Sequence, residues 1–316
     1  MNTTVSYAGK VLVTGANGYI GSEVIRTLNM LGIAVAGTVR LKSPNAALIP
    51  IGNIDRHTNW AIALKDIDCV IHTAGKAHES TDGQDEYVYD EVNVAGTLRL
   101  LQESEKFGVK RFIFISTIKV HGEFSVKGCA FSEVAPCNPV PVYARSKLRA
   151  EQAIASFCEG KTIEYVIIRP PLVYAASAPA NFRRLMKIAN SCFPLPFGRI
   201  DNRRSMIALP HLVDIIRLCI SHPRAANEVF DVSDDEALSL PQIIKALCTR
   251  AILKPWILPV PLKCLAVLND RLYSQLVRSL EVDNSYVKKC IGWQPEQSAL
   301  VALKNSAEQY KCSKMK

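Results

Sequence analysis

Tyr143 and Lys147 lie one helical turn apart in the pentapeptide YARSK and could together carry out proton transfer. A phenol titrates at about pH 10 in water, which is too high for a general base at neutral pH. An ammonium group on the same helix face stabilises the phenolate and lowers the pKa of the phenol. The alternative is an exposed turn of helix in which a cation happens to lie near a ring.

Three glycines, Gly15, Gly18 and Gly21, lie in the segment TGANGYIG near the start of the chain. Gly15 permits a tight turn, Gly18 lets a pyrophosphate approach the backbone, and Gly21 allows a helix to pack closely on a strand. The apolar run KVLVT precedes them and an amphipathic segment follows, so the amides of a helix N-terminus would face the phosphates. The segment predicts a dinucleotide-binding site.

Apolar runs alternate with amphipathic segments through the first half of the chain. Strands are predicted at 10–15, 33–40, 68–75, 111–117 and 164–174, and helices at 20–32, 89–108 and 143–159. Strands that are apolar throughout indicate a parallel sheet covered on both faces. The fold class is therefore α/β, a doubly wound (Rossmann) parallel sheet with its ligand beyond the carboxyl ends of the strands.

The composition of the sequence changes after about residue 170, where Pro and Gly become frequent and the expected helices are shorter. We predict a dinucleotide-binding domain over 1–170 and a smaller, mostly substrate-binding part over 171–316. Some segments of the second part, such as 211–222, should pack back on the first. The apolar stretch 251–268 contains three prolines, which favours a packed lid or core segment over a membrane-surface contact.

Composition excludes several classes of protein. Hydrophobic residues make up 48% and charged residues 21% of the chain, as in an ordinary globular protein. No leader peptide and no membrane-spanning run is visible, and the ten cysteines include no CxxC pair, which predicts reduced thiols in a cytoplasmic protein without a metal site. The net charge of +9 is spread without blocks, which favours anionic small molecules over nucleic acid as partners.

Four motifs occur in register: TGANGYIG, NVAGTLRL, STIKVHG and YARSK, followed by IGWQP near residue 291. Together they resemble the extended short-chain dehydrogenase/reductase family, and within it the nucleotide-sugar epimerase/dehydratase branch. The resemblance covers nearly the whole chain. It implies a catalytic group of Thr117, Tyr143 and Lys147, with Ser116 as a rival of Thr117. It also implies a homodimer formed through helices at about 88–107 and 143–159.

The resemblance further implies a bound NAD or NADP. The residues expected to contact it are Gly15, Asn17, Gly18, Tyr19, Ile20, Gly21, Arg40, Asn53, Ala74, Gly75, Asn93, Ser116, Tyr143, Lys147 and Pro170. The second strand ends without the carboxylate that usually binds ribose hydroxyls, and Arg40 could pair with a 2′-phosphate, which favours NADP. Alternatively Arg40 stacks on adenine with either cofactor. Asn93 either supports the strand-end geometry or caps a turn.

A UDP-sugar is the substrate that the resemblance implies, with contacts from Lys119, Asn181, Phe182, Arg204 and Arg278. A guanidinium fork suits a diphosphate, although each arginine could also be a plain surface residue. Lys119 replaces the acidic residue that dehydratases of this branch carry, which argues against 4,6-dehydration; a solvated loop lysine is the alternative. His72 and His121 are interpreted as satisfied core or loop histidines.

These features lead to a ranked set of functions. The first is reduction at C4 of a UDP-activated 4-keto hexose, N-acetylated and 6-deoxy, for surface polysaccharide synthesis. The alternative is a UDP-glucose or UDP-N-acetylglucosamine 4-epimerase that keeps NAD tightly bound. A reductase of non-sugar ketones would share the catalytic group but would not need Arg204. A non-catalytic cofactor-binding protein would typically lack Tyr143 or Lys147, and both are present.

Overall fold

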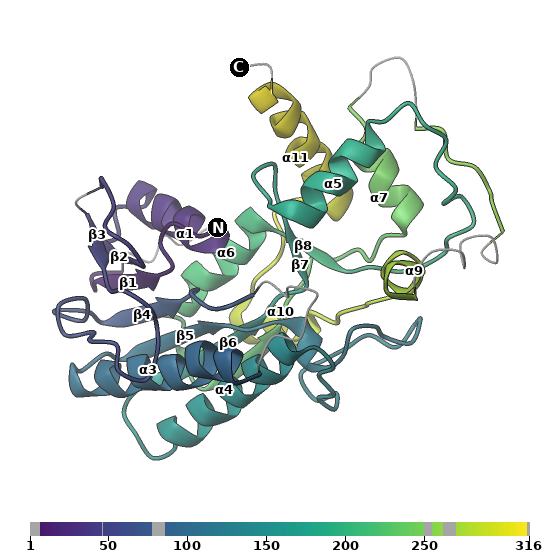
Figure 1. Cartoon of the computed structure of the whole chain (residues 1–316). Coiled ribbons are helices and arrows are strands. Elements are labelled where there is room, and N and C mark those ends of the chain that lie inside the picture. Colours follow the sequence, from purple (N-terminus) through teal and green to yellow (C-terminus); the bar gives the residue numbers. More distant parts are fainter. Residues whose placement is uncertain (1–6, 46, 78–85, 250–254, 262–269, 315–316) are drawn as a thin grey trace.

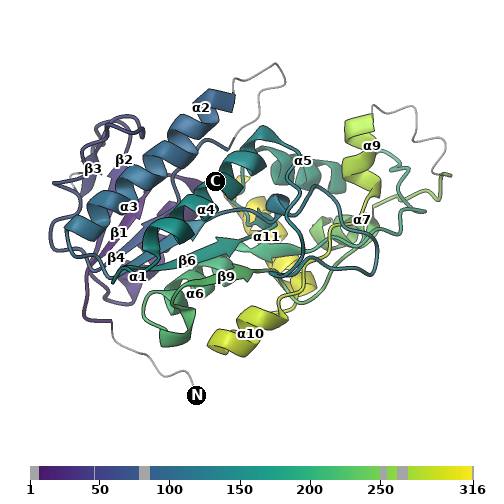
Figure 2. The same ribbon diagram turned by 90° about the horizontal axis from the view of Figure 1, so that it is seen from below.

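A single parallel sheet of seven strands organises most of the chain in the computed structural model, which describes residues 7–45, 47–77, 86–249, 255–261 and 270–314. The order across the sheet is β3-β2-β1-β4-β5-β6-β9 (Figures 1 and 2). The strands are β1 (Val11–Thr14), β2 (Val35–Val39), β3 (Leu48–Pro50), β4 (Cys69–His72), β5 (Arg111–Ile115), β6 (Glu164–Arg169) and β9 (Glu228–Asp231). The chain winds outward from β1 in both directions, which confirms the doubly wound fold and puts the switch point between β1 and β4.

Helices cover both faces of this sheet. On one face lie α1 (Tyr19–Met30) and α6 (Leu209–Cys219), and on the other lie α3 (Gly96–Lys106) and α4 (Val142–Cys158) (Figure 1). Each face has its own apolar core. The core on the α1 side also takes in the short helix α10 (Ser285–Ile291). The central strands β1, β4 and β5 are buried throughout because both faces are covered, as their apolar sequences indicate.

The helix predicted over 89–108 consists of three pieces in the structure. It begins with α2 (Glu86–Asp90), continues through a π-helical turn, η1 (Glu91–Ala95), and ends with α3. Hydrophobic periodicity does not register such a turn, because the apolar stripe continues across it. Single π turns are frequent at functional sites, and this one carries Asn93.

The prediction of one strand over 164–174 was wrong. The strand β6 ends at Arg169, and after Pro170 and Pro171 a separate strand, β7 (Leu172–Tyr174), pairs in parallel with β8 (Met206–Ala208) in a two-stranded sheet. Proline has no N–H to donate, so two consecutive prolines interrupt the ladder of the main sheet.

A third apolar core lies outside the seven-stranded sheet. It contains Tyr174, Phe182, Ile244 and Leu303, and it lies among β7, β8 and several helices. These helices are α5 (Ala180–Ala189), α7 (Leu240–Leu247) and α11 (Ala299–Lys314), with α9 (Asp270–Val277) alongside. Segment 211–222 falls in and just beyond α6, which packs on α1 and the main sheet. Two short 3-10 turns complete the described elements: η2 (Ile118–Val120) and η3 (Pro223–Ala225).

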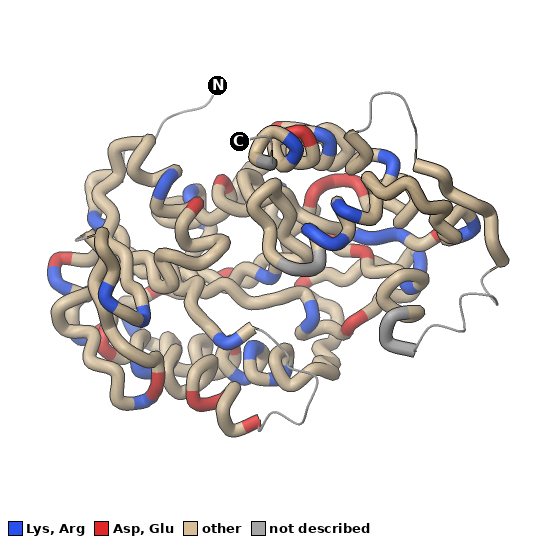
Figure 3. Tube along the Cα trace, turned by 45° about the horizontal axis from the view of Figure 1, so that its top comes forward, with Lys and Arg blue, Asp and Glu red and all other residues tan. Residues whose placement is uncertain are grey.

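Most of the apolar stretch 251–268 lies outside the described residues. Of the part within them, Ile257 forms a parallel bridge with Leu195. Lys and Arg are distributed over both parts of the chain (Figure 3). Within the described ranges no helix is both long enough and apolar enough to cross a membrane.

Candidate active site

The turn after β1 is built around the predicted glycines. Gly15 has a φ of +67°, a conformation that favours glycine, and its carbonyl oxygen accepts the amide of Gly18 at 2.8 Å. A Cβ on Gly21 would collide with the same carbonyl oxygen and would lie 2.8 Å from Thr73 Oγ1. Gly18 is the N-cap of α1 and has no side chain. The first amides of that helix therefore face the turn without a side-chain cap.

A pocket of about 500 Å³ opens at the carboxyl ends of β1, β2 and β4. Its lining includes seven of the predicted cofactor residues: Gly15, Asn17, Gly18, Arg40, Asn53, Ala74 and Gly75. The sequence did not single out its other lining residues, which are Thr38, Val39, Leu41, Ile51, Gly52, Ile54, Thr73 and Val92. Most of these follow or end a strand, so their position at the sheet edge was the signal that could have found them. Tyr19, Ile20 and Gly21 form the first turn of α1, where Tyr19 and Ile20 pack against the core.

Arg40 and Asn53 are exposed at the rim of this pocket. The strand β2 ends at Val39, and among the described residues no carboxylate lines the pocket. The backbone carbonyl of Asn53 accepts from Thr58 Oγ1 at 2.9 Å, which holds the 51–54 segment in place while leaving the Asn53 amide group for a ligand.

Asn93 connects the pocket to helix α4. Its Oδ1 accepts from the Lys76 amide at 2.8 Å, and its Nδ2 donates to the Lys76 carbonyl at 3.0 Å and to Ser146 Oγ at 2.9 Å. A Cβ on Gly75 would lie 3.0 Å from Asn93 Oδ1 and 3.4 Å from Lys147 Nζ. Two roles were predicted for Asn93. Its hydrogen bonds with Lys76 agree with the first, in which Asn93 supports the segment that follows β4.

Lys147 is buried at the end of β5. Its Nζ donates to the Ile115 carbonyl at 2.8 Å and lies 4.3 Å from the centre of the Phe114 ring. Burial lowers the pKa of Lys147 to about 8, an effect that the Glu151 carboxylate opposes. Tyr143 is half-buried one turn earlier, in the first turn of α4 after the extended residue Pro141. The helix thus carries Tyr143 and Lys147 on the side that meets β5.

Thr117 and Ser116 differ in what their hydroxyls do. Ser116 Oγ donates to Glu151 Oε1, in the interior and away from the pocket. Thr117 is the N-cap of η2, where its Oγ1 accepts from the Lys119 amide at 3.3 Å and can still donate its own proton. The Pro170 carbonyl accepts from the Ile118 amide at 3.0 Å, which ties this turn to the end of β6. Of the two predicted candidates, Thr117 is therefore the one whose hydroxyl can still donate to a ligand.

The two histidines interpreted as core or loop residues, His72 and His121, have partners in the interior. The His72 ring contacts Thr14 Oγ1 at 2.7 Å and Thr97 Oγ1 at 3.0 Å, and burial lowers the pKa of His72 to about 3, so the ring is neutral. His121 Nε2 lies 2.9 Å from Asp231 Oδ2. Burial opposes the charged form of His121, but hydrogen bonds with the Asp231 and Cys137 side chains and the Asp231 charge raise its pKa to about 9. Neither ring lines the pocket at β1 and β2.

Residues 11–233 match the NAD dependent epimerase/dehydratase family. The chain belongs to this family. A UDP-glucose 4-epimerase of Vibrio cholerae is 36% identical over 311 residues, which cover 95% of each chain. A short-chain dehydrogenase/reductase superfamily protein from Agrobacterium tumefaciens with bound NAD has a TM-score of 0.79 at 20% identity, covering 97% of this chain and 98% of that one. A UDP-glucose 4-epimerase from Thermotoga maritima with UDP-glucose has a TM-score of 0.76 at 23% identity, covering 97% and 100%.

The residues present fit the nicotinamide dinucleotide of this epimerase/dehydratase family. A Cβ at Gly21 would collide with the Gly15 carbonyl oxygen and with Thr73, so glycine lets α1 pack closely on the turn after β1, as a dinucleotide-binding turn requires. The pocket is of nucleotide size, and Gly75 in its lining lies beside Lys147, because a Cβ there would be 3.4 Å from Lys147 Nζ. Gly15, Gly18 and the first turn of α1 would hold the phosphates, and Asn53 and Arg40 the adenosine end.

The residues predicted to contact substrate fall into separate places. Arg204 Nη1 donates to the backbone carbonyls of Gln275 and Arg278, each at 3.1 Å, and burial lowers the pKa of Arg204. The structure thus brings Arg204 and Arg278 together. The exposed guanidinium of Arg278 lies 5.2 Å from the centre of the Phe124 ring.

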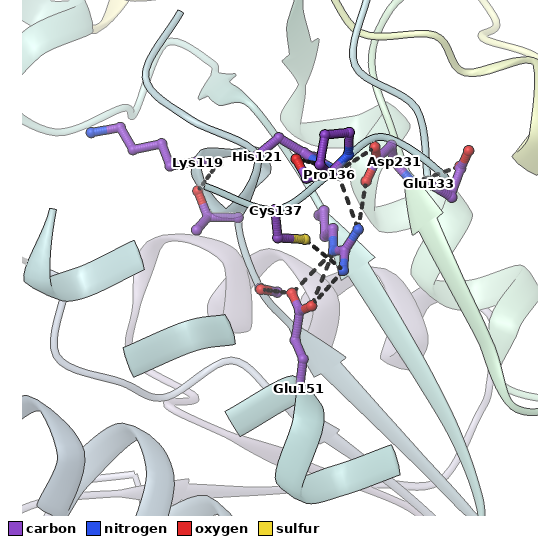
Figure 4. Close-up of polar contacts among 10 residues, drawn as sticks. Lys119, His121, Glu133, Pro136, Cys137, Glu151 and Asp231 are labelled. Atoms are coloured by element: carbon purple, nitrogen blue, oxygen red, sulfur yellow. Dashed lines mark hydrogen bonds and ion pairs between the residues drawn. The ribbon is translucent and has the colours of Figure 1, made fainter. Parts of the chain in front are cut away.

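The remaining three substrate candidates are not part of that pair. Phe182 is 1% exposed and packs on Tyr174 in the third core, so its side chain is occupied in packing. Asn181 lies in the first turn of α5, but its side chain lies outside what the structure describes. Lys119 is partly exposed and extends away from the buried side chains around Glu151 (Figure 4).

Proposed function

We propose that the protein is an NAD(P)-dependent oxidoreductase that acts at C4 of a UDP-activated hexose. The observation that carries the proposal is the placement of Tyr143 and Lys147 on one side of α4, beside the Thr117 turn and joined to the dinucleotide pocket through Gly75 and Asn93. A nicotinamide dinucleotide, when bound, supplies the hydride acceptor or donor.

The protein's own residues handle the proton. Tyr143 would take a proton from the sugar hydroxyl or return one to the ketone, and Thr117 would donate a hydrogen bond to the same oxygen. The buried ammonium of Lys147 would stabilise the phenolate because water does not screen it there. Arg204 and Arg278 would meet the diphosphate of the nucleotide. Residues 1–170 would then hold mostly the dinucleotide and residues 171–316 mostly the sugar nucleotide.

Epimerisation at C4 is the version that the Vibrio cholerae relative supports, because the likeness to that UDP-glucose 4-epimerase extends over 95% of both chains. In this version a tightly held NAD would supply the hydride chemistry at both faces of the same C4. Reduction of a 4-keto sugar by NADPH is the second candidate. It is favoured by Arg40 at the pocket rim and by the lack of a carboxylate among the described residues there. An N-acetylated, 6-deoxy sugar would suit either version.

The nucleotide content and turnover of the purified protein distinguish the two versions. Protein that releases NAD on denaturation and converts UDP-glucose or UDP-N-acetylglucosamine to the 4-epimer, followed by proton NMR, is an epimerase. Protein that contains no nucleotide but oxidises NADPH in the presence of a UDP-4-keto sugar is a reductase.

Tyr143→Phe should abolish turnover in either case, and Tyr87→Phe is the matched control, because the Tyr87 side chain is 62% exposed. Full turnover by the Tyr143→Phe variant, or no conversion of any UDP-hexose with either cofactor, would contradict the proposal.

A further inference from the structure

Four charged side chains meet in the interior where β5, β6 and β9 end (Figure 4). We call Glu151, Arg169, His121 and Asp231 the buried ionic cluster. Arg169 Nε lies 3.1 Å from Glu151 Oε1, and Arg169 Nη2 lies 2.6 Å from Glu151 Oε2. The other side of the guanidinium lies 3.1 Å from His121 Nε2 and 3.6 Å from Asp231 Oδ1. Glu151 and Arg169 are 4% and 6% exposed, so water screens this ion pair little.

Glu151 stands on the same side of α4 as the catalytic pair. Tyr143, Lys147 and Glu151 follow one another at intervals of four residues, which places them along one stripe of the helix. Lys147 donates to the Ile115 carbonyl and Glu151 accepts from Ser116 Oγ. Two consecutive residues of the chain are thus held by two consecutive turns of α4, and the next residue is Thr117.

The charge of Glu151 also acts on Lys147. Burial favours the neutral amine of Lys147, and the Glu151 carboxylate is the charge that opposes this effect. Of the other ionisable groups nearby in the described part of the chain, His72 on β4 is kept neutral by burial. Arg169 on β6 is paired with Glu151 itself, and beyond it His121 and Asp231 face each other. The carboxylate of Glu151 is therefore the group whose removal changes the field at Lys147 most directly.

We propose that Glu151 is a positioning residue for the catalytic group: through Ser116 it fixes the backbone that presents Thr117, and it places a buried negative charge one helical turn from Lys147. This role goes beyond an ion pair that only stabilises the fold. The test of this role by kcat rests on the proposed function, whereas the test by titration of Lys147 does not.

The charge effect is tested by titrating Lys147 in the whole protein. Protein labelled with ¹⁵N-lysine is followed by NMR of the Nζ signal from pH 6 to 11, and the signal is assigned by its loss in Lys147→Met. Glu151→Gln keeps the shape and an acceptor for Ser116 but loses the charge, so the Lys147 midpoint should fall by about one pH unit. Asp90→Asn is the matched control. The Asp90 carboxylate also pairs with an arginine, Arg149 of α4, at 2.6 Å, but Asp90 is partly exposed. In Asp90→Asn the pH midpoint of Lys147 should equal that of the wild type.

The positioning effect is tested separately with Ser116→Ala, which removes the hydroxyl and leaves the charge of Glu151. This variant should keep the pH midpoint of Lys147. Its kcat should fall about tenfold or more with little change in KM, because a displaced Thr117 hydroxyl affects the reacting oxygen and not the binding of the substrate. Glu151→Asp keeps the charge on a shorter side chain, so it should restore the midpoint that Glu151→Gln loses.

An unchanged Lys147 midpoint in Glu151→Gln, or wild-type kcat in Ser116→Ala, would overturn the proposal. Should Glu151→Gln fail to fold, the kcat of Ser116→Ala and the midpoint of Glu151→Asp decide the question, since each changes only a few atoms. Should no UDP-hexose be turned over by the wild-type protein, the proposed function fails while the titration of Lys147 still judges Glu151.

Discussion

Replacing His121 with glutamine should remove a pH-dependent part of the stability. His121 is 4% exposed, follows directly after the η2 turn, and stacks on Phe131 with ring centres 5.3 Å apart. When charged, the ring can donate from Nε2 to Asp231 at 2.9 Å. When neutral, the same nitrogen can accept from Arg169 at 3.1 Å. A glutamine at this position would keep a polar side chain of similar length but could not carry the charge.

The size and sign of the effect follow from the pKa of His121. Burial opposes the charge, but the contacts with Asp231 and Cys137 outweigh it and raise this pKa to about 9. A pKa raised in the folded protein gives stability that is fully present below the ordinary value of about 6.5 and is lost as the pH rises through 9. At about 1.4 kcal/mol per pH unit, the difference corresponds to on the order of 3 kcal/mol. The value of about 9 already includes the opposing effect of the Arg169 charge.

Urea unfolding followed by circular dichroism measures this effect at pH 6, 7, 8 and 9.5. The difference in unfolding free energy between wild type and His121→Gln should shrink steadily from pH 6 to pH 9.5. Comparing the two proteins cancels the titrations of Glu133 and Lys147, which overlap this range. His57→Gln is the control, because the His57 side chain is exposed and the variant should show a constant difference. A constant difference for His121→Gln as well would refute the reasoning.

Four further predictions concern other sites. Gly21→Ala should weaken dinucleotide binding by about a hundredfold, measured by calorimetry, because the added Cβ collides with the Gly15 carbonyl oxygen. Arg40→Asp should reduce the affinity for NADPH relative to NADH by about tenfold, measured by fluorescence titration; equal losses for both would show that Arg40 does not select the cofactor. Burial raises the pKa of Glu133 to about 7, so stability should fall as the pH rises from about 4.5 through 7, and Glu133→Gln should flatten this decline in urea melts. Light scattering should give the mass of a dimer, as the family resemblance predicts, and a monomer would contradict that expectation.

Much of the fold could be predicted because the strands of a doubly wound sheet are apolar on both faces. Runs such as 111–115 and 164–168 therefore stand out from the amphipathic helices between them. The break at Pro170 was missed because the apolar pattern continues into β7. The chemistry of proline, rather than the pattern, carried that information. The π turn at 91–95 left no mark in the sequence, since it shifts the backbone without changing which residues are apolar.

The candidate site, like the fold, could be predicted from the sequence only in part. Spacing along one helix predicted that Tyr143 and Lys147 share a face, and the glycine turn predicted the pocket next to β1. The sequence did not predict that Ser116 would bind Glu151 rather than compete with Thr117, because that choice depends on α4 lying against the end of β5. The second four-residue interval, from Lys147 to Glu151, was visible in the sequence and was the available signal.

The composition of the buried ionic cluster explains why its histidine should be charged. Glu151 and Asp231 bring two negative charges, and Arg169 brings one positive charge. With His121 neutral the cluster would bury one uncompensated carboxylate, which costs several kcal/mol in a protein interior. With His121 protonated the four charges balance. Because His121 ends the turn that begins at Thr117, loss of its proton should disturb the catalytic hydroxyl as well as the fold. Stability should therefore decline between pH 6.5 and 9, and activity should decline near pH 9, where His121 of the folded protein loses its proton. A decline in stability alone would separate the cluster from the catalytic group.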